Sequence, residues 1–271
     1  MGLAKELLSV IISKAFNCFD RLYLPAKIIC LLLIPSLAFA TTYTNPGQGT
    51  TVTGGDTVNY TASVAANSVN NLDITNSVLN STVTINITAT GNVTNSTIFR
   101  DIFNFTGGLA YTALVNVSVG GQLKHNSQTK EILDDDYSGT GGTIRLTNAG
   151  STIGRVNYSS SRTTREVINT GSMSGDILNA TRVDNSGGGN ISYGGTGING
   201  VDLVNNSANL FTSIALNNNG IMNQNGTGVT TGNISGGSGS VLHIGPTTAN
   251  AFSSGASISV PTITVPAGSS F

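Results

Sequence analysis

The sequence predicts an all-β fold, a right-handed parallel β-helix (β-solenoid) with rungs of about 21 residues, a rung being one full turn of the backbone. Three observations predict it. No proline occurs between Pro46 and Pro246, and proline is excluded from central strands because it cannot donate a ladder hydrogen bond. Short runs of alternating apolar and polar residues recur between Gly- and Asn-rich turns, and one phrase repeats at a fixed spacing.

The alternating runs mark individual strands. In the clearest run, residues 82–88, Val83, Ile85 and Ile87 alternate with polar residues. This period of two gives a strand one apolar side and one solvent-facing side. Similar runs lie at 58–64, 113–119, 143–146 and 257–265. The Gly-Gly and Asn-Gly groups between the runs supply turns with positive φ.

The rung length comes from an internal repeat. The phrase LTNAGS at 146–151 aligns with VINTGS at 167–172, and VDNS at 183–186 aligns with VNNS at 204–207. Both alignments have the same spacing, about 21 residues, and such a period is typical of solenoids. About 11 rungs, stacked about 4.8 Å apart, would form a rod about 50 Å long. We expect aliphatic side chains to stack inside it and Asn side chains to form ladders at the bends.

Residues 1–40 are predicted to be an extended, helical signal peptide that is cleaved after Ala40. Lys27 precedes the apolar core at 28–34, and Ala38–Phe39–Ala40 is a small-x-small cleavage site of the kind found in secretory leaders. The core is too short to span a bilayer, which takes about 20 apolar residues. Residues 1–26 either belong to a long leader or precede a later translation start.

Residues 41–271 are predicted to form a single β-solenoid domain. Both cysteines, Cys18 and Cys30, fall in the leader, so the ladder must supply the stability that disulfides give many small secreted domains. The leader contains four of the 12 basic residues and two of the 13 acidic residues. Residues 41–271 therefore keep 8 basic and 11 acidic residues, a net charge of about −3. No basic stripe remains, so nucleic-acid binding is not expected. The most charged stretch, 121–142, is interpreted as a projecting loop with a helical turn at 129–133.

No catalytic, cofactor-binding or metal residue is assigned from the sequence, and no cofactor is expected. Asp134, Asp135 and Asp136 offer carboxylates to calcium, but their spacing is not that of the EF-hand loop. The segment Gly195–Gly200 matches the dinucleotide-binding glycine pattern, which requires a following helix and a later acidic residue. Neither is expected here, because the stretch is Asn-rich and Asp202 is the last acidic residue.

Both histidines are interpreted as non-catalytic. His125 is placed in the charged loop and His243 on the outer side of a strand. Neither has a partner at the spacing of metal ligands.

Polysaccharide cleavage is the enzymatic alternative, since lyases and hydrolases often use the β-helix. Glycoside hydrolysis needs two placed carboxylates. Asp184 and Asp202 are separated by nearly one predicted rung, and Glu166 is a third candidate. No companion basic group accompanies them, so we expect a protein without catalysis. Acids gathered within about 10 Å in one groove would favour the enzyme. A structural or filament-forming fragment, pairing through a bare ladder end, is the other alternative.

Two phrases resemble those of bacterial autotransporter passenger domains and filamentous haemagglutinin-like adhesins, VINTGSMSG at 167–175 and LNNNGIMN at 216–223. The resemblance covers most of residues 41–271. It implies an exported adhesin of a Gram-negative bacterium, either held at the cell surface or released. Its partner would be a host-surface protein or a glycan. Autotransporters also carry a C-terminal membrane barrel. The sequence to Phe271 shows no such pattern, so export to the surface is expected to use a separate or missing translocator, and the protein would otherwise be periplasmic.

Overall fold

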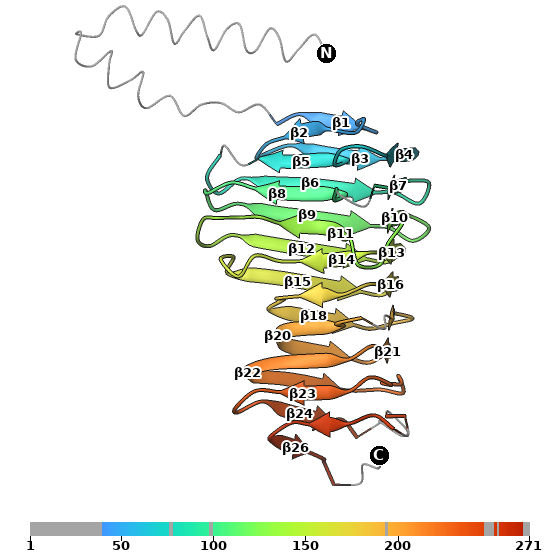
Figure 1. Ribbon diagram of the computed structural model, residues 1–271, viewed down its shortest axis with the longest axis vertical. Helices are drawn as coiled ribbons and strands as arrows, with labels where there is room; N and C mark the ends of the chain where they lie inside the picture. The colour runs from blue at the N-terminus through green and yellow to red at the C-terminus, as the bar shows by residue number, and fades with distance from the viewer. Residues whose placement is uncertain are drawn as a thin grey trace, which may run out of the picture. The chain divides into compact units, whose positions relative to one another are not determined.

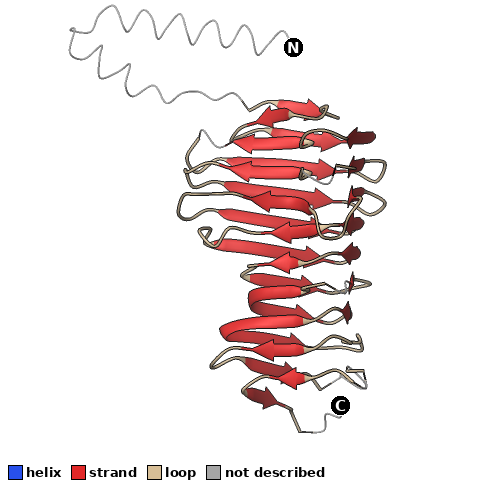
Figure 2. Cartoon of the chain, in the orientation of Figure 1, coloured by secondary structure: helices blue, strands red, loops and turns tan. Residues whose placement is uncertain are grey.

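The computed structural model describes residues 40–75, 78–97, 100–192, 195–246, 252–253 and 255–267. The predicted leader therefore lies outside the described residues, except for Ala40. Every regular element described is a strand, and all strand pairs are parallel (Figures 1 and 2). The predicted fold class, a parallel β-helix, is confirmed. Within the described ranges there is no helix that is long and apolar enough to cross a bilayer.

The strands stack into three parallel sheets, and the chain visits the third, first and second sheets in turn. The first sheet contains β1 (Thr42–Thr44), β3 (Thr57–Tyr60), β6 (Thr82–Ile87), β9 (Thr112–Val117), β12 (Thr143–Asn148), β15 (Thr164–Asn169), β18 (Arg182–Asn185), β20 (Ile198–Asn206), β22 (Ile214–Gln224), β24 (Val241–Ile244) and β26 (Thr262–Thr264). The second contains β4 (Ser63–Ala66), β7 (Asn92–Asn95), β10 (Gln122–His125), β13 (Ser151–Ile153), β16 (Ser172–Ser174), β19 (Asn190–Ser192) and β21 (Asn209–Phe211).

The third sheet contains β2 (Thr50–Val52), β5 (Leu72–Thr75), β8 (Phe103–Thr106), β11 (Glu131–Asp135), β14 (Arg155–Asn157), β17 (Ile177–Leu178), β23 (Ile234–Gly236) and β25 (Ile258–Ser259). The long strands β20 and β22 pass from the third sheet into the first, so that each belongs to both. The first sheet thus has 11 levels, which agrees with the number of rungs expected from the sequence.

The rung length differs between the two halves of the rod. Thr143 pairs with Thr164 and Arg182 with Leu203, both at the spacing that the repeat predicts. The rungs between β3 and β12 are longer, since Thr82 pairs with Thr112, whereas the first rung is short, since Thr42 pairs with Thr57. The difference lies in the connections, because seven residues separate β7 from β8 whereas Gly154 alone separates β13 from β14. At Gly154, with φ +130°, an added Cβ would lie 2.6 Å from the Ile132 side chain, so only glycine fits this tight corner.

In-register pairing fills the interior with columns of similar chemistry. The central inward column of the first sheet is Val58, Ile85, Val115, Leu146, Val167, Val183, Val204, Met222 and Leu242, all fully buried. Burial of each large aliphatic side chain contributes about 1.5–3 kcal/mol. Since a one-residue slip would turn a whole strand inside out, this column also fixes the register.

A second inward column changes from aliphatic to amide side chains where the rungs shorten. It consists of Tyr60, Ile87, Val117, Asn148, Asn169, Asn185, Asn206, Gln224 and Ile244. Each of the four asparagines donates to the next amide along the column, with N–O distances of 2.8–2.9 Å. The amides also donate hydrogen bonds to the backbone near the following turns. Asn185 Nδ2, for example, donates to Asn209 O at a distance of 2.9 Å. The predicted Asn ladder at the bends is confirmed for these rungs.

The charged segment 121–142 is not a projecting loop, and the expected helical turn at 129–133 is wrong. Residues 122–125 and 131–135 are strands β10 and β11, which pair in register with the rungs on either side. Leu123 and Leu133 point into the core, while Lys124 and Asp134 point outward. Alternation therefore places the charges on the outside of the rod, where water solvates them.

The buried amide column yields a prediction. Asn185→Ala removes side-chain bonds to Asn169, Asn206 and Asn209 O inside the rod, and we expect it to lower the free energy of unfolding by about 2–3 kcal/mol. Asn86→Ala, the control, removes a similar amide ladder on the half-buried outer side and should cost less than about 1 kcal/mol. Urea unfolding followed by circular dichroism compares the two. Equal losses would show that the inner ladder has no special weight.

Candidate functional site

The outer side of the first sheet carries side-chain ladders of its own. Near the N-terminus Asn116 donates to Asn86 at 2.9 Å and Asn86 to Asn59 at 3.0 Å. Further along the same register, Asn223 donates to Asn205 at 2.8 Å, and Asn205 donates to the Asp184 carboxylate at 2.7 Å. Parallel pairing causes this order, because it places equivalent positions of successive rungs directly above one another.

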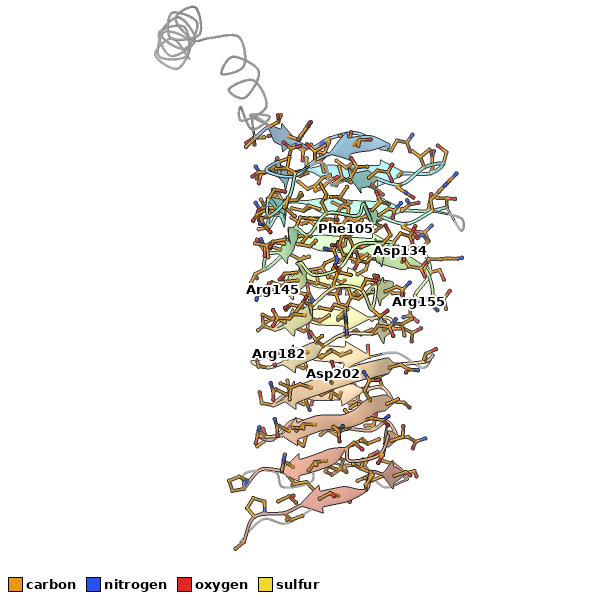
Figure 3. All side chains as sticks on the ribbon, turned by 90° about the vertical axis from the view of Figure 1, so that its left-hand side faces the viewer. Phe105, Asp134, Arg145, Arg155, Arg182 and Asp202 are labelled. Atoms are coloured by element: carbon orange, nitrogen blue, oxygen red, sulfur yellow. The ribbon has the colours of Figure 1, made fainter. Side chains whose placement is uncertain are left out.

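Two arginines on this side are neutralised by neighbouring carboxylates. Arg145 bonds Glu166 in the next rung, with an Nε–Oε2 distance of 2.6 Å. Arg182 holds both oxygens of Asp184, with Nε–Oδ1 and Nη2–Oδ2 distances of 2.9 and 2.6 Å. Both arginines lie along one edge of the rod in Figure 3, and Asp134 and Arg155 lie along the other. Exposed pairs of this kind contribute about 0–1 kcal/mol each, so their main effect is to fix where the guanidinium groups lie.

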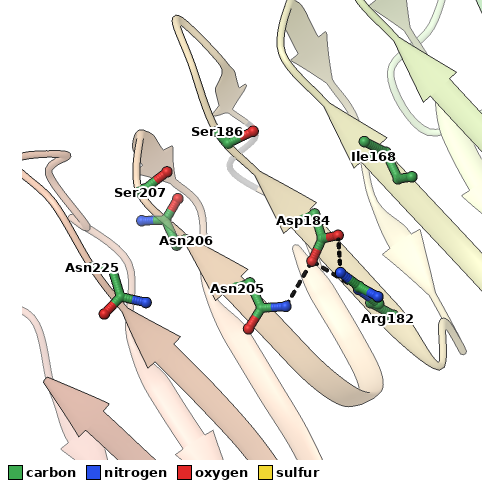
Figure 4. Close-up of a pocket in the computed structure, with 8 residues that line it drawn as sticks. All are labelled: Ile168, Arg182, Asp184, Ser186, Asn205, Asn206, Ser207 and Asn225. Carbon is green, nitrogen blue, oxygen red and sulfur yellow. Dashed lines mark hydrogen bonds and ion pairs between the residues drawn. The ribbon is translucent and has the colours of Figure 1, made fainter. Parts of the chain in front are cut away.

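A shallow groove lies beside Arg182 and Asp184, where the first sheet turns into the second (Figure 4). Its volume is about 280 Å³, and it is lined by Ile168, Arg182, Asp184, Ser186, Asn205, Asn206, Ser207 and Asn225. Unequal turns create it. Two residues, 207 and 208, connect β20 to β21, whereas four connect β18 to β19 and five lie between β22 and the bridge residue Thr230. The short middle turn leaves a notch between two longer ones.

The groove offers polar side chains for which the described part of the chain provides no hydrogen-bond partner. Among the described residues, no hydrogen bond reaches the side chains of Ser186, Ser207 or Asn225, and Figure 4 shows them apart from the Arg182–Asp184–Asn205 cluster. These three side chains follow the inward amides Asn185, Asn206 and Gln224, so they occupy the same place in successive rungs. The groove is thus lined by hydroxyls, amides and one neutralised ion pair.

A cluster of carboxylates lies on the outer side of the third sheet. Burial raises the pKa of Asp101 to about 7, with Asp134 and Glu131 adding repulsion, and the Asp101 and Glu131 carboxyl groups share a hydrogen bond. Burial likewise raises the pKa of Asp134 to about 6, with repulsion from Asp136 added and a 3.0 Å bond from Asn157 opposing it. Arg155 pairs with Glu131 at 3.2 Å. The cluster therefore holds protons near neutral pH.

The three consecutive aspartates do not converge on a calcium site. Asp134 is half-buried on the outer side, Asp135 points into the rod, and Asp136 is exposed beyond the end of β11. Across the part of the chain that the structure describes, no three His, Cys, Asp or Glu side chains form a group that could hold a metal ion.

Asp135 has a structural partner that the sequence did not indicate. Arg162 Nε lies 2.9 and 2.8 Å from the two Asp135 oxygens, and both side chains are buried. The guanidinium carbon is 4.4 Å from the Tyr111 ring centre and 4.3 Å from that of Tyr137. Such cation–π contacts favour a desolvated arginine. The cluster is closed to solvent and belongs to the core.

The three acids considered for glycoside cleavage do not share the groove. Glu166 and Asp184 lie on the first sheet but each is paired with an arginine. Asp202 accepts a bond from Asn217 at 2.7 Å, and the pairing of Leu203 with Arg182 places Asp202 about 10 Å along the strand from the level of Asp184. Only Asp184 lines the groove.

The remaining sequence candidates have structural positions. Gly197 and Gly200 lie just before and within strand β20, so no helix follows Gly195–Gly200 and the dinucleotide pattern is accidental. His243 lies on the exposed side of β24, as predicted. The placement of His125 in a loop is wrong. It ends β10 and is buried, with Nε2 2.9 Å from Thr97 O and Nδ1 accepting from Ser127 N.

No family model, no curated protein and no solved structure matches this chain. The β-solenoid fold therefore stands on the observed strand pairing and the sequence pattern.

The carboxylate cluster yields a pH prediction. The pKa of Asp101 is about 7 in the folded protein and about 3.9 when unfolded. Between these values the folded state keeps a proton that the unfolded chain has lost, so stability falls as the pH rises from about 4 to 7. Asp101→Asn should flatten this fall, by no more than about 1 kcal/mol because solvent screens the partly exposed carboxyl.

Urea unfolding at pH 5 and pH 8 measures the difference. The matched control is Asp202→Asn, which alters an exposed carboxylate outside the cluster and should keep the wild-type pH dependence. The same pH dependence in Asp101→Asn and in the wild type would refute the assignment.

Proposed function

We propose that the protein is exported and acts as an attachment protein, a β-helical rod whose outer side chains contact a host or environmental surface without catalysis. The observation that carries the proposal is the first sheet's outer side, where regular amide columns border a groove with unpartnered hydroxyl and amide groups. Aligned polar groups on a rigid ladder are already ordered, which lowers the entropic cost of binding. The signal-like segment at 28–40 and the adhesin-like phrases support export.

The proposal predicts saturable binding by the purified exported protein. Fluorescently labelled protein is applied to cultured epithelial cells and to films of immobilised polysaccharide, and we expect half-saturation at about micromolar concentrations on at least one of them. A non-adhesive protein of similar size and charge is the control. Binding that stays linear with concentration, or that equals the control on every surface, would refute an attachment function.

Polysaccharide cleavage is a second candidate, which Asp101 favours. A carboxyl group whose pKa is raised to near neutral pH is the kind of acid that glycosidases use to protonate the leaving group, and Asp101 has a pKa of about 7. If cleavage occurs, the protein should release reducing ends from a polysaccharide substrate, and Asp101→Asn should abolish this release. We expect no release from either protein, and an Asp101-dependent release would replace attachment by catalysis.

A further inference from the structure

We propose that the groove beside Arg182 and Asp184 binds a neutral glycan chain that runs along the rod axis. This inference rests on the proposed attachment function and names the ligand class of that surface. It starts from the geometry of the turns, in which the two-residue turn at Ser207 lies between longer turns in the adjacent rungs. A ligand in this notch touches at least three rungs, because the lining residues come from β15, β18 and β20 and from the turns that follow β18, β20 and β22.

Charge excludes the ionic ligands. Arg182 is the only cationic side chain among the lining residues, and two contacts with the Asp184 carboxylate neutralise its charge. Asp184 is in turn the only carboxylate of the lining and accepts from Asn205 as well. A multivalent anion would meet a single guanidinium group whose charge is already neutralised. A metal ion would meet a single carboxylate, which is too few ligands for calcium, since calcium takes six to eight oxygen ligands.

Surface chemistry also excludes the common peptide and lipid modes. Ile168 is the only aliphatic side chain of the lining, so the groove has no apolar anchor for a lipid chain or an amphipathic helix. Strands β18, β20 and β22 are paired on both sides within the ladder, so a peptide finds no free strand edge to extend. The ligand must be held by hydrogen bonds from side chains.

The free groups suit a polyhydroxylated ligand. The hydroxyls of Ser186 and Ser207 and the amide of Asn225 each donate and accept, as sugar hydroxyls do. The second N–H of Asn205 is also available, since its other N–H bonds Asp184 and its Oδ1 accepts from Asn223. Ser186 and Asn205 are half-buried, whereas Ser207 and Asn225 are exposed. A ligand that covers these side chains must replace the hydrogen bonds that water gives them, which favours a ligand rich in hydroxyl groups.

The spacing favours a chain over a single sugar. Positions in register recur at every rung, about 4.8 Å apart along the axis. The Asp184–Asn205–Asn223 ladder and the Ser186–Ser207–Asn225 series form two parallel rows on this repeat. A glycan that extends along the axis meets these polar groups over three rungs, between Ile168 and His243 in the first row, so affinity should increase with chain length until these rungs are spanned.

The test compares two tyrosine substitutions at equivalent places. Ser207→Tyr fills the notch. Ser118→Tyr, the control, alters an exposed residue that follows Val117 in the same column, several rungs away. The full chain is expressed with its leader, the exported protein is purified, and circular dichroism with thermal unfolding checks that both variants fold. Calorimetric titration then uses neutral cello-, manno- and chito-oligosaccharides of increasing length, with heparin-derived sulfated oligosaccharides as the charged comparison.

We expect at least one neutral series to bind, with little change between about 0.05 and 0.5 M NaCl because no net charge is involved. Ser207→Tyr should weaken this binding by about 10-fold or more and Ser118→Tyr by less than about 2-fold, given that one well-placed contact is worth about 1–3 kcal/mol. Three results would overturn the proposal: no neutral oligosaccharide binds, only the sulfated ones bind, or Ser207→Tyr binds as the wild type does.

The surface-attachment assay, run on the same proteins, separates this inference from the proposed function. If the wild type and Ser207→Tyr attach equally well, the groove is not the glycan site although attachment stands. If neutral oligosaccharides bind through Ser207 but the protein attaches to no surface, the groove stands and attachment falls.

Discussion

The structure depends on the in-register stacking of inward side chains. In a parallel ladder each residue lies directly above its equivalent in the next rung, so the Val58-to-Leu242 column can be dry and continuous only if every rung keeps its phase. A shift by one residue exchanges the inner and outer sides of a strand. Much of the variation in rung length therefore lies in the connections, such as the one between β7 and β8.

Corners are therefore where this fold can acquire function. The strand segments beside the groove, β18 and residues 203–206 of β20, keep the alternation of the first sheet. What differs is the number of residues in three successive turns, two at the notch and four or five beside it. Loops tolerate such changes at low entropic cost, while the ladder beneath holds the lining residues in place. A rigid scaffold with variable connections is the usual basis of binding surfaces.

The sequence predicts the ladder well because the ladder is local in origin. Alternation identifies strands such as β6 and β12, and the phrase shared by 146–151 and 167–172 gives the correct pairing of β12 with β15. The charged strands β10 and β11 were missed because Lys124, Asp134 and their neighbours dilute the apolar signal, although Leu123 and Leu133 keep the period of two.

The sites could not be read in the same way, because contacts between rungs depend on a rung length that varies. The period of the sequence repeat, applied uniformly, would place Asp101 beside Gln122. The actual register pairs Asn104 with Asp134 across one of the longer rungs, and so brings Asp101 to Glu131. The groove has a similar origin, since it requires the turns of three rungs to be compared at known register.

The buried Arg162–Asp135 pair lies where the wide part of the rod meets the narrow part. Asp135 belongs to the rung between β9 and β12, which is one of the longer rungs, and Arg162 belongs to the next, which has the shorter length of the repeat. On the side of the longer rungs Tyr111 and Tyr137 enclose the guanidinium, whereas the small residue Ala180 precedes β18 at the same corner two rungs after Tyr137. Separating a buried pair leaves an uncompensated charge at a cost of about 3–5 kcal/mol. A shift of strand register at this level would separate Arg162 from Asp135 and incur this cost. A contact between aliphatic side chains would tolerate such a shift. The ion pair therefore disfavours every other register at the level where the rungs become shorter.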